Sequence, residues 1–161
     1  MTEMSRKFLA VSDETEECLS ALIFAGMRSK AVSAGLVILR CARVPGLGGW
    51  IGLDKDISQD AIDAARVKAT QHADAVEART GVIAELVVVD DEPIDAIRKL
   101  IEGDPTIKVL ILAAGTGRLG PGPLVSRLAK GKPIANRPIA VTVIPGDLSD
   151  KQLDEIGGLA G

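Results

Sequence analysis

Aromatic side chains are scarce in this 161-residue chain, which has two Phe, one Trp and no Tyr, together 2% of its residues. Apolar residues still make up 47% of the sequence, so the core has to be built mainly from aliphatic side chains. The sequence also lacks any run of about 18 consecutive apolar residues, so no membrane-spanning helix is expected.

The net charge and the number of cysteines are also low. Lys and Arg number 19 against 22 Asp and Glu, and this net charge of -3 argues against a dedicated nucleic-acid binder, which carries a basic surplus. Cys18 and Cys41 lack CxxC spacing and lie among apolar residues, so we expect buried free thiols in a reducing compartment. The first residues lead into a strand-like segment without a signal-peptide stretch. A cytoplasmic protein is therefore predicted.

Short apolar segments alternate with helical patterns along the chain. The apolar segments are not interrupted by polar residues, which is typical of strands buried on both faces of a parallel sheet. A helix is expected to begin at Asp13, with Glu16 in capping-box spacing, and further helices are expected over 58–80, 93–103 and 124–130. The expected strands are 7–11, 36–44, 84–89, 108–113 and 139–144.

This order predicts an α/β fold, a five-stranded parallel open sheet flanked by helices on both faces in a three-layer, Rossmann-like sandwich. Residues 1–147 are expected to form one domain. Residues 148–161 are expected to form a C-terminal tail with a weak helix, which begins at the capping-box pattern Ser149–Gln152. In such sheets ligands bind at the carboxyl ends of the strands, where the strand order reverses.

One stretch concentrates features of a ligand site: Gly115-Thr-Gly-Arg-Leu-Gly-Pro-Gly-Pro123, directly after the apolar segment 109–114. Its glycines and prolines predict a loop whose backbone N–H groups approach an anion, as in phosphate-binding loops. A tight structural turn is the plainer alternative. The residues predicted to contact a ligand here are Gly115, Thr116, Gly117, Gly120 and Gly122.

Two common nucleotide-binding motifs fit this stretch poorly. Gly115-Thr-Gly-Arg-Leu-Gly120 matches GxGxxG, but Pro121 and Pro123 interrupt the long helix that a dinucleotide-binding fold requires. Lys132 is followed by Pro133 rather than by Ser or Thr, so a P-loop is not expected.

Several segments together resemble the universal stress protein family: Phe8-Leu-Ala-Val-Ser-Asp13, Gly35-Leu-Val-Ile-Leu-Arg40, the long middle helix and Val109-Leu-Ile-Leu-Ala-Ala-Gly-Thr-Gly117. The resemblance covers roughly the first nine-tenths of the chain. It implies an adenine nucleotide alpha hydrolase-like fold and a homodimer formed through the last strand, Ile139–Ile144. It also implies that the chain falls either in the branch of the family that binds ATP or in the branch that does not.

The resemblance assigns two residues outside the glycine stretch. Asp13 fills the position of the aspartate that closes the first strand, where it would hold the sugar or a bound Mg²⁺. Cys41 lies near the position where the family places an apolar side chain against the adenine. The alternatives are that Asp13 only caps a helix and that Cys41 only belongs to the core.

The family's glycine motif, G-x2-G-x9-G-(S/T), is only partly present. Gly117-Arg-Leu-Gly120 fits its first half, but ten residues then precede Gly131, and Lys132 replaces the Ser or Thr. A second register, from Ala114 and Gly117, puts Arg127-Leu128 in the place of Gly-Ser. The side chains that could supply the missing phosphate contact are Ser126, Arg127, Lys130 and Lys132.

The sequence therefore predicts a dimeric stress-response regulator that binds ATP or ADP, with or without Mg²⁺. The alternative is a universal stress protein that binds no nucleotide and acts as a protein interaction module. No nucleophile–His–acid set is evident, so at most slow ATP hydrolysis is expected. His72, the single histidine, is expected at a partly covered helix position without partners, and Asp90–Glu92 at an acidic helix start. Trp50 lies in a glycine-rich connection, 45–55, and has no assigned role.

Overall fold

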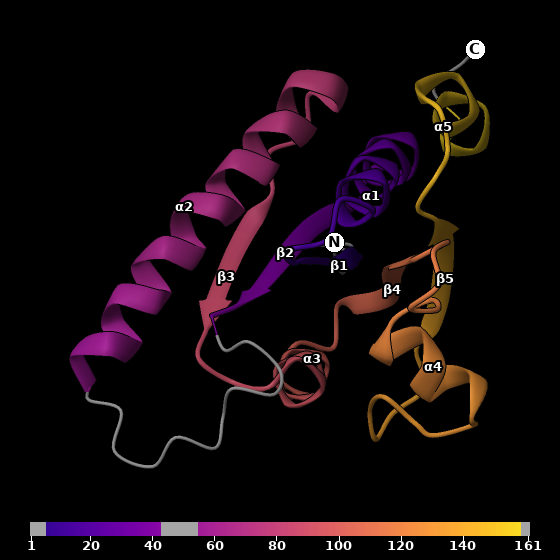
Figure 1. The fold of residues 1–161 in the computed structure, drawn as a ribbon. Helices are drawn as coiled ribbons and strands as arrows, with labels where there is room; N and C mark the ends of the chain where they lie inside the picture. The colour runs from indigo at the N-terminus through magenta and orange to yellow at the C-terminus, as the bar shows by residue number, and fades with distance from the viewer. Residues whose placement is uncertain (1–5, 43–54, 159–161) are drawn as a thin grey trace, which may run out of the picture.

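The structure, a computed structural model, describes residues 6–42 and 55–158, except for the side chains of residues 55–58. Strands and helices alternate through these residues (Figure 1). The strands are β1 (Lys7–Ser12), β2 (Gly35–Cys41), β3 (Glu85–Val89), β4 (Ile107–Ala114) and β5 (Ala140–Pro145). The helices are α1 (Cys18–Val32), α2 (Lys55–Thr80), α3 (Pro93–Gly103), α4 (Pro123–Ala129) and α5 (Asp150–Gly157).

The five strands form one parallel sheet in the order β3-β2-β1-β4-β5. The predicted five-stranded parallel sheet is confirmed. The chain proceeds outward from β1 through β2 to β3, then returns to the other side of β1 with β4 and β5. The strand order thus reverses between β1 and β4, which opens a crevice at their carboxyl ends. β5 lies at an edge of the sheet.

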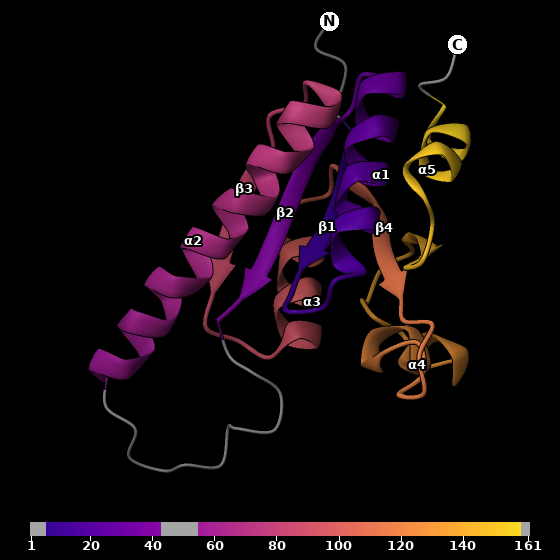
Figure 2. The same ribbon diagram turned by 45° about the horizontal axis from the view of Figure 1, so that its top comes forward.

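Helices cover both faces of the sheet, as predicted. α1, α2 and α5 share one apolar cluster, which includes Leu22, Val76 and Leu153. α3 packs on the opposite face through Ile97 and Ile101. Figures 1 and 2 show α1 and α2 on one side of the strands and α3 on the other. The helices on the two faces form the outer layers of the sandwich, and the two apolar clusters fill the space between them and the sheet.

The core is aliphatic, as the composition predicted. The largest side chains that are less than 2% exposed are all Leu, Ile, Val or Met. Burial of these side chains is the main favourable contribution to folding, because few aromatic rings are available to contribute. Across the described ranges, no helix combines the length and the apolar character needed to cross a membrane.

The helix predicted to begin at Asp13 instead begins at Cys18, so that prediction is wrong. Asp13 does not cap the helix: its Oδ1 atom accepts hydrogen bonds from the backbone N–H of Thr15, at 2.8 Å, and from the Thr15 hydroxyl. The side chain therefore closes a local turn, for which the same residue types are favoured as for a helix N-cap. Glu17, at the actual N-cap, makes no side-chain capping bond. A four-residue loop thus separates Asp13 from α1.

The second strand ends at Cys41, earlier than predicted. The predicted last residue of this strand, Val44, lies outside the described residues, and so does Trp50. The long helix starts at Lys55 and ends at Thr80, where Gly81 adopts a φ of +79°. Glycine adopts this left-handed conformation readily, and the helix ends at Thr80, the predicted last residue.

The predicted capping box at the start of the C-terminal helix is confirmed. The Ser149 hydroxyl accepts from the N–H of Gln152, and the Gln152 side chain accepts from the N–H of Ser149. Leu153 on α5 is 2% exposed and joins the cluster around α1. Arg79 of α2 forms ion pairs with Asp150 and Asp154 of α5 at 3.3 and 2.8 Å. α5 is therefore packed against the helix layer.

Candidate functional site

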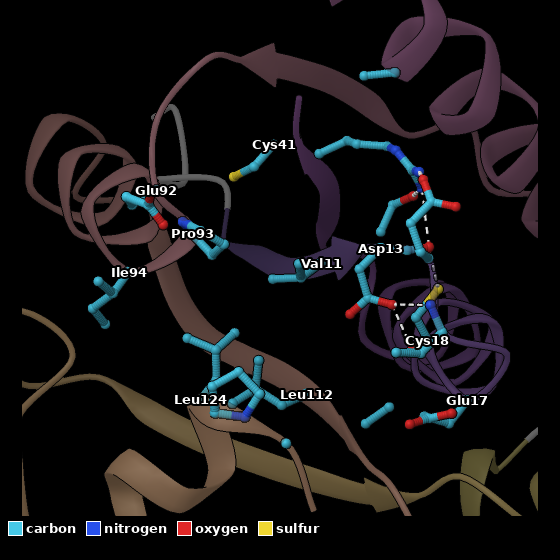
Figure 3. Close-up of a pocket in the computed structure, with 18 of the residues that line it drawn as sticks. Val11, Asp13, Glu17, Cys18, Cys41, Glu92, Pro93, Ile94, Leu112 and Leu124 are labelled. Atoms are coloured by element: carbon cyan, nitrogen blue, oxygen red, sulfur yellow. Dashed lines mark hydrogen bonds and ion pairs between the residues drawn. The ribbon is translucent and has the colours of Figure 1, made fainter. Parts of the chain in front are cut away.

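A cavity of about 760 Å³ lies at the carboxyl ends of β1, β2 and β4, the place at which the strand order predicts a ligand site (Figure 3). Its walls come from the ends of these strands, the loop after β1, the start of α2, and the first turns of α3 and α4. The cavity is large enough for a drug-sized or nucleotide-sized ligand.

Aliphatic side chains form most of the wall. Val11 is the next to last residue of β1, Leu112 belongs to β4, and Ile94 and Leu124 come from the first turns of α3 and α4. Figure 3 shows these four side chains around the same space. Ala65 contributes from α2 and is 6% exposed. An apolar wall of this kind suits a flat, weakly polar ring system.

Arg40, the next to last residue of β2, is the buried cation of the site. It is 3% exposed and lies beside Ser12 in the parallel register of β1 and β2. Its Nη1 donates to the Ser12 hydroxyl and to the Asp13 carbonyl, both at 3.0 Å, and its Nη2 pairs with the Glu14 carboxylate. Its Nε has no hydrogen-bond partner within the described residues. The sequence patterns assigned no role to Arg40. A charge in the otherwise apolar segment 36–41 was nevertheless a signal of a functional residue.

The predicted site residues divide into two groups. Asp13, Cys41 and Gly122 line the cavity. Five others do not line it: Gly115, Thr116, Gly117, Gly120 and Ser126.

The first part of the glycine stretch, 115–120, turns back on itself and does not line the cavity, whereas Pro121, Gly122 and Pro123 do. The N–H of Gly115 donates to the Pro121 carbonyl and the N–H of Gly120 donates to the Gly117 carbonyl, each at 3.2 Å. These two amides are therefore used within the loop and are not directed at a ligand. A Cβ atom on Gly115 would lie 2.8 Å from the Gly120 carbonyl oxygen, so close backbone packing also requires this glycine. The amide cradle predicted from the sequence is thus partly occupied by the loop's own carbonyl groups.

His72 has partners that sequence analysis did not find. Its Nδ1 lies 2.6 Å from the Ser12 hydroxyl and 4.0 Å from the Cys18 Sγ. The expectation that His72 lacks partners is wrong, because 60 and 54 residues separate these contacts along the chain. Burial, together with the nearby Arg40, lowers the pKa of His72 below its ordinary value of 6.5. The imidazole is then neutral at pH 7, and Ser12, which accepts from Arg40, can donate its own proton to Nδ1.

Neither thiol near the cavity is activated. Burial raises the pKa of Cys18 to about 12 and that of Cys41 to about 11. Both are therefore protonated at neutral pH and serve as small apolar groups. Ser12 is 2% exposed, which does not suit a nucleophile. The arrangement is suited to binding, because the buried Arg40 and Ser12 and the half-buried His72 form a row of polar groups beside an apolar cavity.

Comparison with known proteins relates this architecture to one group of solved structures. UspA from Lactobacillus plantarum, a universal stress protein, superposes with a TM-score of 0.64 at 18% identity, covering 89% of this chain and 99% of that one. A universal stress protein in complex with cAMP gives a TM-score of 0.58 at 18% identity, covering 89% and 98%. One from Archaeoglobus fulgidus in complex with dAMP gives 0.50 at 19% identity, covering 87% and 97%. No protein-family model and no curated protein sequence matches the chain. The sheet order, the helix layers and these superpositions agree that the chain has the universal stress protein fold, as the sequence resemblance implied.

Proposed function

We propose that the chain is a universal stress protein whose cavity binds an adenine nucleotide. The observation that carries this proposal is the cavity of about 760 Å³ at the switch point of the sheet, with aliphatic walls and one buried cation, Arg40. The walls suit a purine ring, and the polar groups on the β1–β2 side suit a sugar and a phosphate. The solved complexes of similar fold with cAMP and dAMP support an adenine nucleotide as the ligand.

The residues on the cavity wall have distinct proposed roles. Asp13 binds the sugar through Oδ2, because its Oδ1 already accepts from Thr15. The neutral Cys41 thiol contacts the base, and the Gly122 N–H faces the phosphate side. With ATP or ADP, any Mg²⁺ is held mainly by the phosphates, because no group of three His, Cys, Asp or Glu in the described residues could hold a metal.

The remaining predicted contacts require a change in the loop. Contact with the nucleotide stays a prediction for the five residues that do not line the cavity. Such contact needs the loop to approach the cavity on binding. The five are Gly115, Thr116, Gly117, Gly120 and Ser126. Hydrogen bonds at Gly115 and Gly120 would then be exchanged for bonds to phosphate oxygens.

Isothermal titration with ATP, ADP and AMP tests the proposal. Ala61 lines the cavity from α2, whereas Ala78 lies on the exposed side of the same helix. We expect Ala61→Phe to fill part of the cavity and to weaken nucleotide binding by about tenfold or more, a loss of about 1.4 kcal/mol. The matched control, Ala78→Phe, should bind like the unmodified protein. Absence of heat at millimolar nucleotide, or equal binding by the two variants, contradicts the proposal.

We also propose that the chain forms a homodimer in the cytoplasm, as predicted from the sequence. β5 is an edge strand, and Val143 on it is 39% exposed. An apolar edge of this kind favours pairing with a second copy of the chain, whether or not nucleotide binds. Light scattering should give a dimer for the unmodified chain and a monomer for Val143→Lys. A monomeric unmodified chain at working concentration contradicts the dimer, and also weakens the alternative of an interaction module that pairs through this edge.

A further inference from the structure

Arg40 stands out among the charged side chains because it is buried in the protein and still lines the cavity. Its side chain is 4% exposed, and its fixed partners are the neutral Ser12 hydroxyl and the Asp13 carbonyl. Its Nε has no partner in the described residues. A guanidinium this far from water needs a negative charge close by, since an unpaired buried charge is strongly unfavourable. Within the described residues, the carboxylate that forms an ion pair with Arg40 is that of Glu14.

Glu14 is an unusual partner for such a cation, because it is largely in solvent. The Glu14 side chain is 74% exposed, against 4% for Arg40. It projects from the loop between β1 and α1, which has no regular secondary structure. An exposed carboxylate gains little from one ion pair, because water solvates it almost as well. Glu14 can therefore leave Arg40 at low cost, provided that another anion takes its place.

The surroundings offer space for that other anion. Arg40 lines the large cavity and also a smaller hollow of about 320 Å³ beside it, and Lys68 and Glu14 line both. His72 lines the smaller hollow, and its lowered pKa keeps the ring neutral, so it does not compete with Arg40 for an anion. Arg40, Lys68 and Arg127 thus present three cations to a ligand that enters the cavity. Three carboxylates besides Glu14 also line it: those of Asp13, Glu17 and Glu92. In the free protein the amides of Gly115 and Gly120 are used within the loop and are not directed at an anion.

We propose that Arg40 binds the phosphate group of the ligand and that Glu14 holds this position in the free protein. Binding then exchanges the Glu14 carboxylate for the phosphate, and Arg40 stays paired in both states. A phosphate offers the guanidinium several acceptor oxygens, so it can accept more hydrogen bonds from Arg40 than the Glu14 carboxylate does. This inference rests on the proposed function, because it takes the ligand to be a nucleotide. It adds that Glu14 opposes binding and that Arg40 distinguishes a nucleotide from its nucleoside.

AMP and adenosine form the matched pair of ligands for the test, because they differ only in the phosphate. In isothermal titration, the unmodified protein should bind AMP at least about tenfold more tightly than adenosine. Glu14→Gln removes the competing charge but keeps the shape of the side chain. It should raise the affinity for AMP by about threefold to tenfold and leave the affinity for adenosine unchanged. Since Glu14 is exposed, this variant is expected to fold normally.

Glu16→Gln is the control for Glu14→Gln. Glu16 lies in the same loop, is exposed and lines the same smaller hollow, but it does not pair with Arg40. It should change the AMP affinity much less than Glu14→Gln does. Arg40→Gln should bring the affinity for AMP down to that for adenosine, if this buried substitution folds.

Three results overturn the inference while leaving the proposed function intact: equal affinity for AMP and adenosine in the unmodified protein, no gain of AMP affinity in Glu14→Gln, or an equal gain in Glu16→Gln. The last would indicate a general effect of charge and no exchange at Arg40. Failure to bind AMP, adenosine, ADP and ATP alike overturns the proposed function, and the inference with it.

Discussion

Gly26 in α1 provides a test of how closely the two long helices pack. A Cβ atom at this position would lie 2.7 Å from Cγ1 of Val76 and 3.0 Å from Oγ1 of Thr80, both on α2. Neither neighbour can move easily. Val76 is 0% exposed, and the Thr80 hydroxyl donates to the Val76 carbonyl at 2.7 Å. Gly26→Ala should therefore push α1 and α2 apart.

Two opposing effects set the magnitude of this change. Alanine stabilises a helix interior by about 1 kcal/mol relative to glycine, whereas overpacking a core of this kind costs about 2 to 3 kcal/mol. The net expectation for Gly26→Ala is a loss of about 1 to 2 kcal/mol in the free energy of unfolding. In a chain of this length, that corresponds to a Tm lower by about 3 to 6 °C. Urea unfolding followed by circular dichroism measures the change directly.

Two further variants make the test of Gly26 specific. Gly103 lies at the exposed end of α3, where a Cβ atom would meet nothing within 4 Å. Gly103→Ala should therefore be neutral or stabilise by about 0.5 kcal/mol, because only the helix propensity changes. Combining Gly26→Ala with Val76→Ala should remove the close contact with Val76 Cγ1. The double variant should therefore lose less free energy of unfolding than the sum of the two single losses, by at least about 1 kcal/mol. The packing argument is refuted if Gly26→Ala is as stable as the unmodified protein.

Three other measurements follow from the structure. Burial lowers the pKa of His72, so the ring signals of this single histidine in NMR spectra should titrate below pH 6.5. Since the folded state binds this proton less readily than the unfolded state, the protein should lose stability as the pH falls below 6.5. The His72→Gln variant should lose less stability over the same pH range. An ordinary or raised pKa of His72 contradicts the half-buried environment. Cys18 and Cys41, with pKa values raised to about 12 and about 11, should react with a thiol reagent at pH 8 far more slowly in the native protein than in urea, and equal rates would argue against their burial. Ser149→Ala removes the capping box of α5 and should cost about 1 kcal/mol in urea unfolding, whereas an unchanged midpoint would show that α5 adds little to stability.

The element order was predictable because its signals are local. Short aliphatic runs, the proline at the start of α3 and Gly81 after α2 each act within a few residues, and each falls where the sequence indicated. The start of α1 was not predictable in the same way. Asp13 and Glu16 fit a capping box by spacing, but the Asp13 carboxylate binds Thr15 instead, and both arrangements favour the same residue types.

The candidate site was predictable in position and only partly in composition. Its location follows from the topology, and Asp13 and Cys41, which the family resemblance assigned to the site, both line the cavity. Arg40 and His72 were missed, because their roles depend on contacts with residues 26 to 60 positions away in the chain. The sequence predicted that amides along the glycine stretch face a ligand, but in the free protein two of them bond within the loop. Backbone flexibility is visible in a sequence, whereas the hydrogen bonds that use up the amides of Gly115 and Gly120 are not.

The central claim is that the cavity at the carboxyl ends of β1, β2 and β4 binds an adenine nucleotide. Amide chemical-shift mapping with a nucleotide tests it most directly, since it reports both binding and position. The account predicts saturable shifts in 12–15, in Cys41 and Ala42, and in Gly122, Leu124 and Val125, with α5 unaffected. The absence of shifts at millimolar nucleotide, or shifts that leave these residues unchanged, would contradict it.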